Sequence, residues 1–127
     1  MAGELRVVLT VPDFDEAVAF YRDALELDQL ADWSGEGGRV ILLDAGRATI
    51  ELFDEQQAES VDLIEASRRV SGPVRLAFGV DDLDGTAQRL LAAGAEAEAP
   101  PVLPPWGGRN ARLRVPDGMQ LTLFSES

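Results

Sequence analysis

The stretch VRLAFGVDDLDGTAQRL (residues 74–90) decides the fold, because it repeats LRVVLTVPDFDEAVAFY (residues 5–21) at a constant offset of 69 residues. In each copy, apolar residues first alternate as in a strand with one buried face, and then recur at helical spacing after an aspartate. Two copies of one pattern predict two copies of one structural unit. The matched positions are Leu5/Val74, Arg6/Arg75, Leu9/Phe78, Val11/Val80, Asp13/Asp82, Phe14/Leu83, Asp15/Asp84 and Val18/Ala87.

The segments that follow each copy extend the unit to βαβββ. After the first helix, extended segments are predicted over about 28–34, 39–44 and 47–53, separated by the turn sequences SGEGG and DAG. After the second helix, which ends at Gly94, come an extended segment broken by prolines (95–108) and strands over 109–115 and 119–124. The endings also match, IELF at 50–53 and LTLF at 121–124. The apolar stripe predicted for the first helix is Phe14, Ala17, Val18, Tyr21 and Leu25.

The prediction is therefore a single α+β domain over residues 1–127. It consists of a first βαβββ module (1–53), a polar and partly helical connector (54–72) and a second βαβββ module (73–127).

Composition excludes several classes of function. The chain has 11 basic and 23 acidic residues, a net charge of −12, which argues against nucleic acid as a partner. No apolar run approaches the roughly 20 residues that span a membrane, and MAGELRVVL is not a secretory signal, so we expect a cytoplasmic protein. Cysteine, histidine and lysine are absent, which excludes thiolate chemistry, Schiff bases and histidine metal ligands.

The segments LTVPDFDEAVAFYRDALEL, LAFGVDDLD and PWGGRNARLRVPDGMQLTLF resemble the vicinal oxygen chelate superfamily, which includes glyoxalase I, bleomycin-resistance proteins and extradiol dioxygenases. The resemblance implies that each βαβββ module forms a curved sheet. Two such sheets pair into a cup that binds a small molecule. It also implies a homodimer, the usual state of small members of this kind.

Strand parity predicts which side chains face the interior of the cup. If the apolar face of each first strand packs on its helix, the opposite face points inward. The inward sets are Arg6, Val8 and Thr10; Thr49, Glu51 and Phe53; Arg75, Ala77 and Gly79; and Gln120, Thr122 and Phe124.

Enzymes of the superfamily hold a divalent metal with one side chain from each of four strands, usually His or Glu. Mapped onto this chain, these positions are Arg6, Glu51, Arg75 and Thr122, of which only Glu51 suits a metal. We therefore expect no metal and no cofactor, but a cluster in which Glu51 pairs with both arginines. Such a cluster either neutralises the floor of the cup, leaves an arginine for an anionic or carbonyl group, or makes Glu51 a general base.

Aromatic residues are the other candidate ligand contacts. Trp106 lies in PPVLPPWGGRN, a rigid loop suited to stacking, and PWG at this place resembles the bleomycin-resistance branch, in which a tryptophan lines the drug groove. Trp33 lies at the end of the second predicted strand. Both tryptophans have a structural alternative, as edge or dimer contacts, and Phe53 and Phe124 either wall the cup or fill it. In 109–115, parity leaves open which face looks inward, although an exposed polar face is favoured.

The sequence thus favours a metal-independent binding protein that sequesters a planar or aromatic natural product or drug. The alternative is a metal-free lyase, isomerase or cyclase with Glu51 as its base, and a third possibility is a structural or regulatory protein whose side chains fill the cup. The predicted ligand-binding residues are Arg6, Trp33, Glu51, Phe53, Arg75, Trp106, Thr122 and Phe124.

Overall fold

The computed structural model describes residues 3–116 and 118–126. Residues 1–2 of the first predicted module, and Asp117 of the PDG turn and Ser127 of the second, lie outside the described residues. The first half comprises β1 (Glu4–Thr10), α1 (Phe14–Val18), η1 (Ala19–Ala24), β2 (Gln29–Asp32), β3 (Val40–Asp44) and β4 (Thr49–Phe53). The connecting helix is α2 (Glu55–Ala66). The second half comprises β5 (Val74–Gly79), α3 (Leu83–Ala92), β6 (Glu96–Ala97), β7 (Arg109–Arg114) and β8 (Gln120–Ser125). The element order on both sides of α2 confirms the predicted α+β class.

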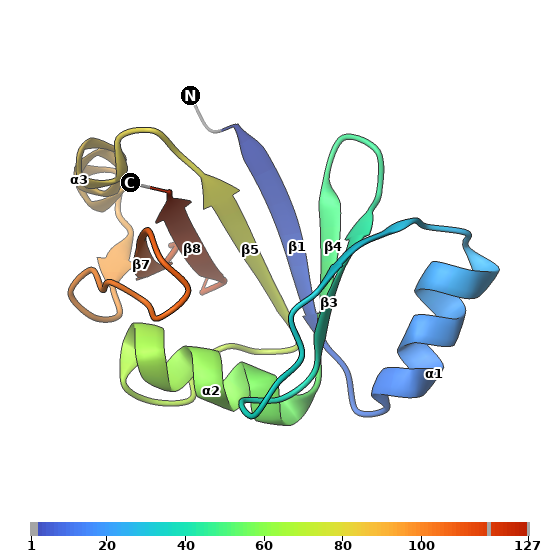
Figure 1. Ribbon diagram of the computed structural model, residues 1–127. Helices are drawn as coiled ribbons and strands as arrows, with labels where there is room; N and C mark the ends of the chain where they lie inside the picture. The colour runs from blue at the N-terminus through green and yellow to red at the C-terminus, as the bar shows by residue number, and fades with distance from the viewer. Residues whose placement is uncertain (1–2, 117, 127) are drawn as a thin grey trace.

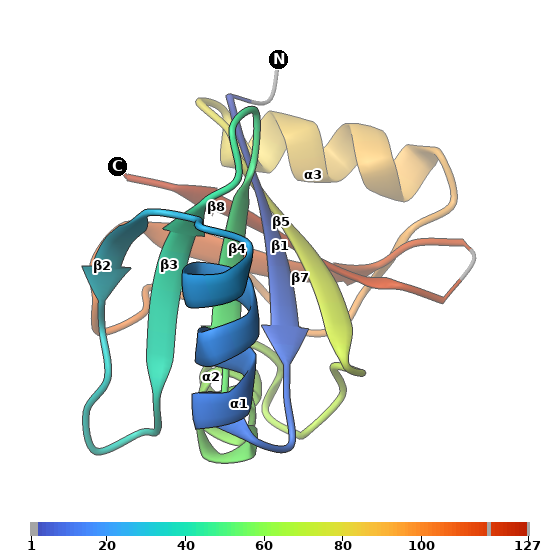
Figure 2. The same cartoon turned by 90° about the vertical axis from the view of Figure 1, so that its right-hand side faces the viewer.

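The strands of the described residues form one curved eight-stranded sheet in the order β2-β3-β4-β1-β5-β8-β7-β6. The two central strands, β1 and β5, are antiparallel, and each has a parallel neighbour on its other side, β4 or β8 (Figure 2). The order read outward from the centre is therefore the same for both halves. The internal repeat of the sequence appears as a pseudo-two-fold relation between β1 and β5, and the two modules of one chain join edge to edge.

Two helices cover the outer face of the sheet at opposite ends (Figure 1). The repeated aspartates begin them: Asp13 accepts a hydrogen bond from the backbone N–H of Glu16, and Asp82 accepts one from Gly85. The helix α1 packs on an apolar cluster of β3 and β4, and α3 packs on the equivalent cluster of β7 and β8.

The stripe predicted for the first helix is wrong at its last position. After α1 the chain widens into the π-helical turn η1, in which the N–H of Leu25 donates to the carbonyl of Phe20, five residues earlier. The wider turn rotates the following residues away from the sheet. Leu25 is therefore exposed, whereas Tyr21 stays partly buried against the outer cluster.

The connector forms a third helix, α2, on the concave side of the sheet (Figure 1). Asp54 begins it by accepting a hydrogen bond from the N–H of Gln57. Ala58 and Val61 of α2 pack against inward side chains of the sheet, among them Val8. This confirms the parity predicted for β1. Among the described residues, no helix is long and apolar enough to cross a bilayer.

Candidate functional site

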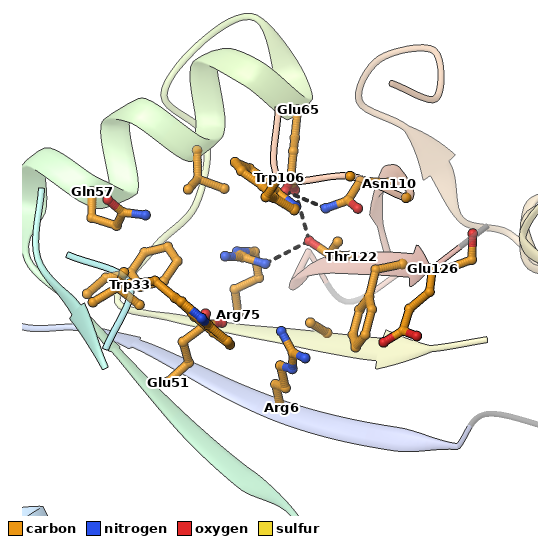
Figure 3. A pocket seen from close by; sticks show the side chains of 18 residues that line it. Arg6, Trp33, Glu51, Gln57, Glu65, Arg75, Trp106, Asn110, Thr122 and Glu126 are labelled. Carbon is orange, nitrogen blue, oxygen red and sulfur yellow. Dashed lines mark hydrogen bonds between the residues drawn. The ribbon is translucent and has the colours of Figure 1, made fainter. Parts of the chain in front are cut away.

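A cavity of about 610 Å³ lies on the concave face beside α2, and we call it the pocket (Figure 3). The structure brings all eight predicted ligand-binding residues to its wall, namely Arg6, Trp33, Glu51, Phe53, Arg75, Trp106, Thr122 and Phe124. The concave face is thus not filled by the protein's own side chains. The wall also includes Ala77, which strand parity placed inside the cup, and residues that were not predicted there, chiefly Gln57, Val61, Glu65 and Asn110.

Strand register sets the floor of the pocket. Glu51 on β4 and Arg75 on β5 stand in one row, on either side of Val8 of β1. Arg6 and Thr122 stand in the next row, on either side of Ala77. Ala77 lines the pocket between its polar neighbours, whereas Val8 is buried in the apolar cluster under α2.

The predicted pairing of Glu51 with both arginines is wrong. Arg6 Nε donates to Glu4 Oε2 at 2.8 Å, and Arg75 Nη1 donates to Thr122 Oγ1 at 2.7 Å. Glu51 forms neither a hydrogen bond nor an ion pair with any residue that the structure describes. The reason lies in the register, because β1 separates Glu51 from Arg75 by two strand spacings of about 4.8 Å each. Arg6 pairs instead with Glu4, which lies two residues away on the same face of β1.

Glu51 is only 8% exposed. Burial raises the pKa of Glu51, and the positive charges of Arg75 and Arg6 only partly oppose it. The pocket floor therefore holds a carboxyl group that takes up a proton more readily than an exposed glutamate.

The guanidinium of Arg6 is held between two aromatic rings. Its carbon lies 5.5 Å from the centre of the Trp33 ring and 4.5 Å from that of Phe124, as cation–π contacts require. The two phenylalanines of the repeat differ in role. Phe53 is buried in the cluster under α2, whereas Phe124 is partly buried and forms a wall.

Both tryptophans of the chain border the pocket while keeping much of their surface in solvent, 48% for Trp33 and 55% for Trp106. Gly108 lies two residues after Trp106. Its φ of +69° and its close approach to the carbonyl oxygen of Ser125 leave no room for a Cβ. The glycine thus fixes the loop that carries Trp106 against the end of β8.

A buried ion-pair network beside the pocket was missed from the sequence. Arg112 of β7 has no exposed surface, and its two Nη atoms donate to Asp62 Oδ1 and Glu65 Oε1 of α2, each at 2.8 Å. Asn110 donates to the other oxygen of Glu65, also at 2.8 Å. The favoured interpretation of an exposed polar face in 109–115 is therefore wrong for Asn110 and Arg112, because α2 covers that face.

A signal for this network does exist in the sequence. Asp62 and Glu65 follow Ala58 and Val61 at helical spacing, so a helical connector would place acids and small apolar residues on one face.

Hydrogen bonding fixes the charge of Asp62. Burial alone would raise the pKa of Asp62, but hydrogen bonds from Ser71 and the guanidinium of Arg112 outweigh it and hold the pKa well below its usual range. Asp62 is therefore ionised throughout the physiological range.

Thr122 links this network to the pocket. Its hydroxyl donates to Glu65 Oε1 at 3.2 Å and accepts from Arg75 Nη1 at 2.7 Å and Arg112 Nε at 3.1 Å. One donor and two lone pairs are all that a hydroxyl offers. Thr122 therefore orients Arg75 and keeps no hydrogen bond in reserve for a ligand.

Comparison with known proteins places this architecture. The model of the Glyoxalase/Bleomycin resistance protein/Dioxygenase superfamily matches residues 5–123. The chain belongs to this superfamily. It is similar to uncharacterized protein YraH of Bacillus subtilis (strain 168), with 34% identity over 126 residues covering 94% of this chain and 95% of that protein.

Solved structures of the superfamily's fold are similar as well. A hypothetical protein of Bacillus halodurans C-125 matches with a TM-score of 0.69 and 18% identity, over 96% of this chain and 92% of that one. Methylmalonyl-CoA epimerase of Mycobacterium tuberculosis matches with a TM-score of 0.63 and 20% identity, over 99% of this chain and 87% of that one. At these identities the likeness shows the fold alone.

The residues at the superfamily's metal positions do not fit a divalent ion. Arg6 and Arg75 are cations, and the lone pairs of Thr122 are taken by two guanidinium groups. Within residues 3–116 and 118–126, no three His, Cys, Asp or Glu side chains converge as a metal site requires.

Proposed function

We propose that this protein binds and sequesters a small planar or aromatic molecule, such as a natural product or a drug, without a metal. The observation that carries the proposal is the pair of half-exposed tryptophans at the border of a 610 Å³ cavity with a polar floor. Exposed indole rings offer stacking surface to a planar ligand, and the polar floor orients it. A bound molecule is withdrawn from its target, so binding alone protects a cell.

Titration with a planar tricyclic probe, anthraquinone-2-carboxylate, followed by calorimetry, tests this proposal. Trp33→Leu and Trp106→Leu should each weaken binding about tenfold, since stacking on one aromatic ring is worth roughly 0.5–1.5 kcal/mol beyond the area it buries. Phe20→Leu is the matched control, because Phe20 is equally exposed but does not line the pocket. Equal affinities for all four proteins would contradict stacking in the pocket.

A second candidate function rests on Glu51, a buried carboxyl that faces the pocket and has no hydrogen-bond partner among the described residues (Figure 3). Such a group can move a proton in a metal-free lyase, isomerase or cyclase reaction. Glu51→Gln separates the two functions. A variant that still binds the natural ligand but no longer converts it would favour the enzyme.

Native mass spectrometry of the purified protein, before and after denaturation, supplies that ligand and the assembly state. We expect a homodimer that carries an organic adduct and no stoichiometric metal. A divalent ion in every chain would contradict the metal-free proposal, and a monomer would contradict the dimer.

A further inference from the structure

We propose that the planar ligand carries an oxyanion, a carboxylate or an acidic phenol or enol, which the guanidinium of Arg75 binds on the pocket floor beside Glu51. This inference rests on the proposed binding function and specifies the chemistry of the ligand.

Arg75 is the anchor because it forms no direct ion pair with a residue that the structure describes, and the carboxylates of Glu65, Glu51 and Asp62 act on its charge only from farther away. Arg75 is only 5% exposed. Its one hydrogen bond goes to a neutral oxygen, that of Thr122. The remaining N–H groups of its planar fork match the two oxygens of a carboxylate. Burying an unpaired guanidinium is costly, and a bound oxyanion would offset that cost.

The other two arginines near the pocket are already committed. Arg6 pairs with Glu4, and aromatic rings lie near its guanidinium. Arg112 lies between two carboxylates of α2 and does not line the pocket. An oxyanion on the floor therefore meets its strongest partner at Arg75.

Glu51 lines the same pocket, on the other side of the buried Val8 from Arg75. The charged groups that act on it are Arg75 of β5, Arg6 and Glu4 of β1, and Glu65 of α2. An ionised Glu51 would repel an oxyanion bound at Arg75 in this pocket, whereas a protonated Glu51 would not. Since burial already favours the protonated carboxyl, we expect ligand binding to be accompanied by proton uptake.

The experiment compares two probes of one shape, anthraquinone-2-carboxylate and anthraquinone-2-carboxamide, by calorimetry from pH 5 to pH 9. At pH 5 the affinity for the carboxylate should be at least about tenfold higher than that for the amide, since hydrogen bonds to charged groups are the stronger ones. The affinity for the carboxylate should fall as pH rises, and the number of protons taken up with each ligand should approach one. In Glu51→Gln the pH dependence should disappear and binding at pH 9 should tighten.

Arg75→Lys keeps the charge but removes the fork, so it should weaken the carboxylate about tenfold and the amide little. Arg47→Lys, at an exposed position outside the pocket, is the matched control. An amide that binds as tightly as the carboxylate, or an unchanged pH dependence in Glu51→Gln, would overturn the oxyanion proposal while leaving the binding function intact. If neither probe binds at any pH, the proposed function fails first.

Discussion

At the scale of a single residue, Glu51 combines burial in the pocket with the absence of a hydrogen-bond partner among the described residues. Its pKa is raised in the folded protein, above that of a glutamate in the unfolded chain. Its contribution to stability is therefore fully present below the unfolded pKa and is lost as pH rises through the folded pKa. Above the unfolded pKa, the raised pKa of Glu51 therefore lowers the free energy of unfolding.

Glu51→Gln should consequently stabilise the protein at pH 8 and have little effect near pH 4. A gain of about 1 kcal/mol corresponds to roughly 3–6 °C in the Tm of a domain of this size. Thermal unfolding at both pH values measures it. Glu36→Gln, at an exposed glutamate that does not line the pocket, is the control. A variant less stable than the parent at pH 8 would show that an interaction of ionised Glu51 outweighs its burial.

The residues of the pocket were predictable, but their pairings were not. Strand parity alone assigns Arg6, Glu51, Arg75 and Thr122 to one face, because alternation is a property of the backbone. Pairing depends on register and on segments distant in sequence. The partner of Arg75 is 47 residues away on β8, at a position that parity places on the inner face but does not pair with it.

At the scale of elements, α2 is the part of the fold that the sequence described least well. Its polar composition suggested a connector, yet its inner face joins both halves of the sheet. Ala58 and Val61 pack on the first half, and Asp62 and Glu65 bind Arg112 of the second. Tertiary packing, not the helix's own hydrophobicity, holds it in place.

Arg112→Leu tests this attachment of α2. The substitution leaves two buried carboxylates without their guanidinium, so we expect a loss of about 3–5 kcal/mol in urea unfolding. Arg109→Leu is the control, since Arg109 lies on the same strand but makes an exposed ion pair with Asp84, worth at most about 1 kcal/mol. Similar losses in the two variants would mean that α2 is held by its apolar contacts alone.

At the scale of the whole molecule, the two-fold relation of the backbone hides an asymmetry of the interior. Leu42 on β3 stands opposite Glu51, and Arg112 on β7 stands opposite Thr122, the position equivalent to Glu51. The repeat therefore predicts the fold from backbone pattern, because both halves need the same strands and helices. It does not predict the ion-pair network of Arg112, because α2 has no counterpart in the repeat and makes apolar contacts on one side and ionic contacts on the other.

Charge over the whole molecule should give stability an optimum at mildly acidic pH. With 23 acidic and 11 basic residues, self-repulsion at pH 7 destabilises the fold, and salt screens it. The raised pKa of Glu51 acts in the same direction, so stability should rise as pH falls toward 5. The pKa of Asp62 is lowered in the folded state, so its stabilisation is complete above about 3.9, the usual value for an unfolded Asp, and is lost below it.

Urea unfolding between pH 3 and pH 8, in 0.05 M and about 0.5 M NaCl, separates these contributions. Salt should raise the urea midpoint at pH 7. Near pH 4.2, the isoelectric point of the sequence, the midpoint should no longer depend on salt. The decline below pH 4 should persist in salt, because the hydrogen bonds and ion pair of Asp62 are buried, and Asp62→Asn should flatten that decline. Stability that rose steadily to pH 8, or an acid decline unchanged in Asp62→Asn, would show that surface repulsion and the α2 network do not govern the pH profile.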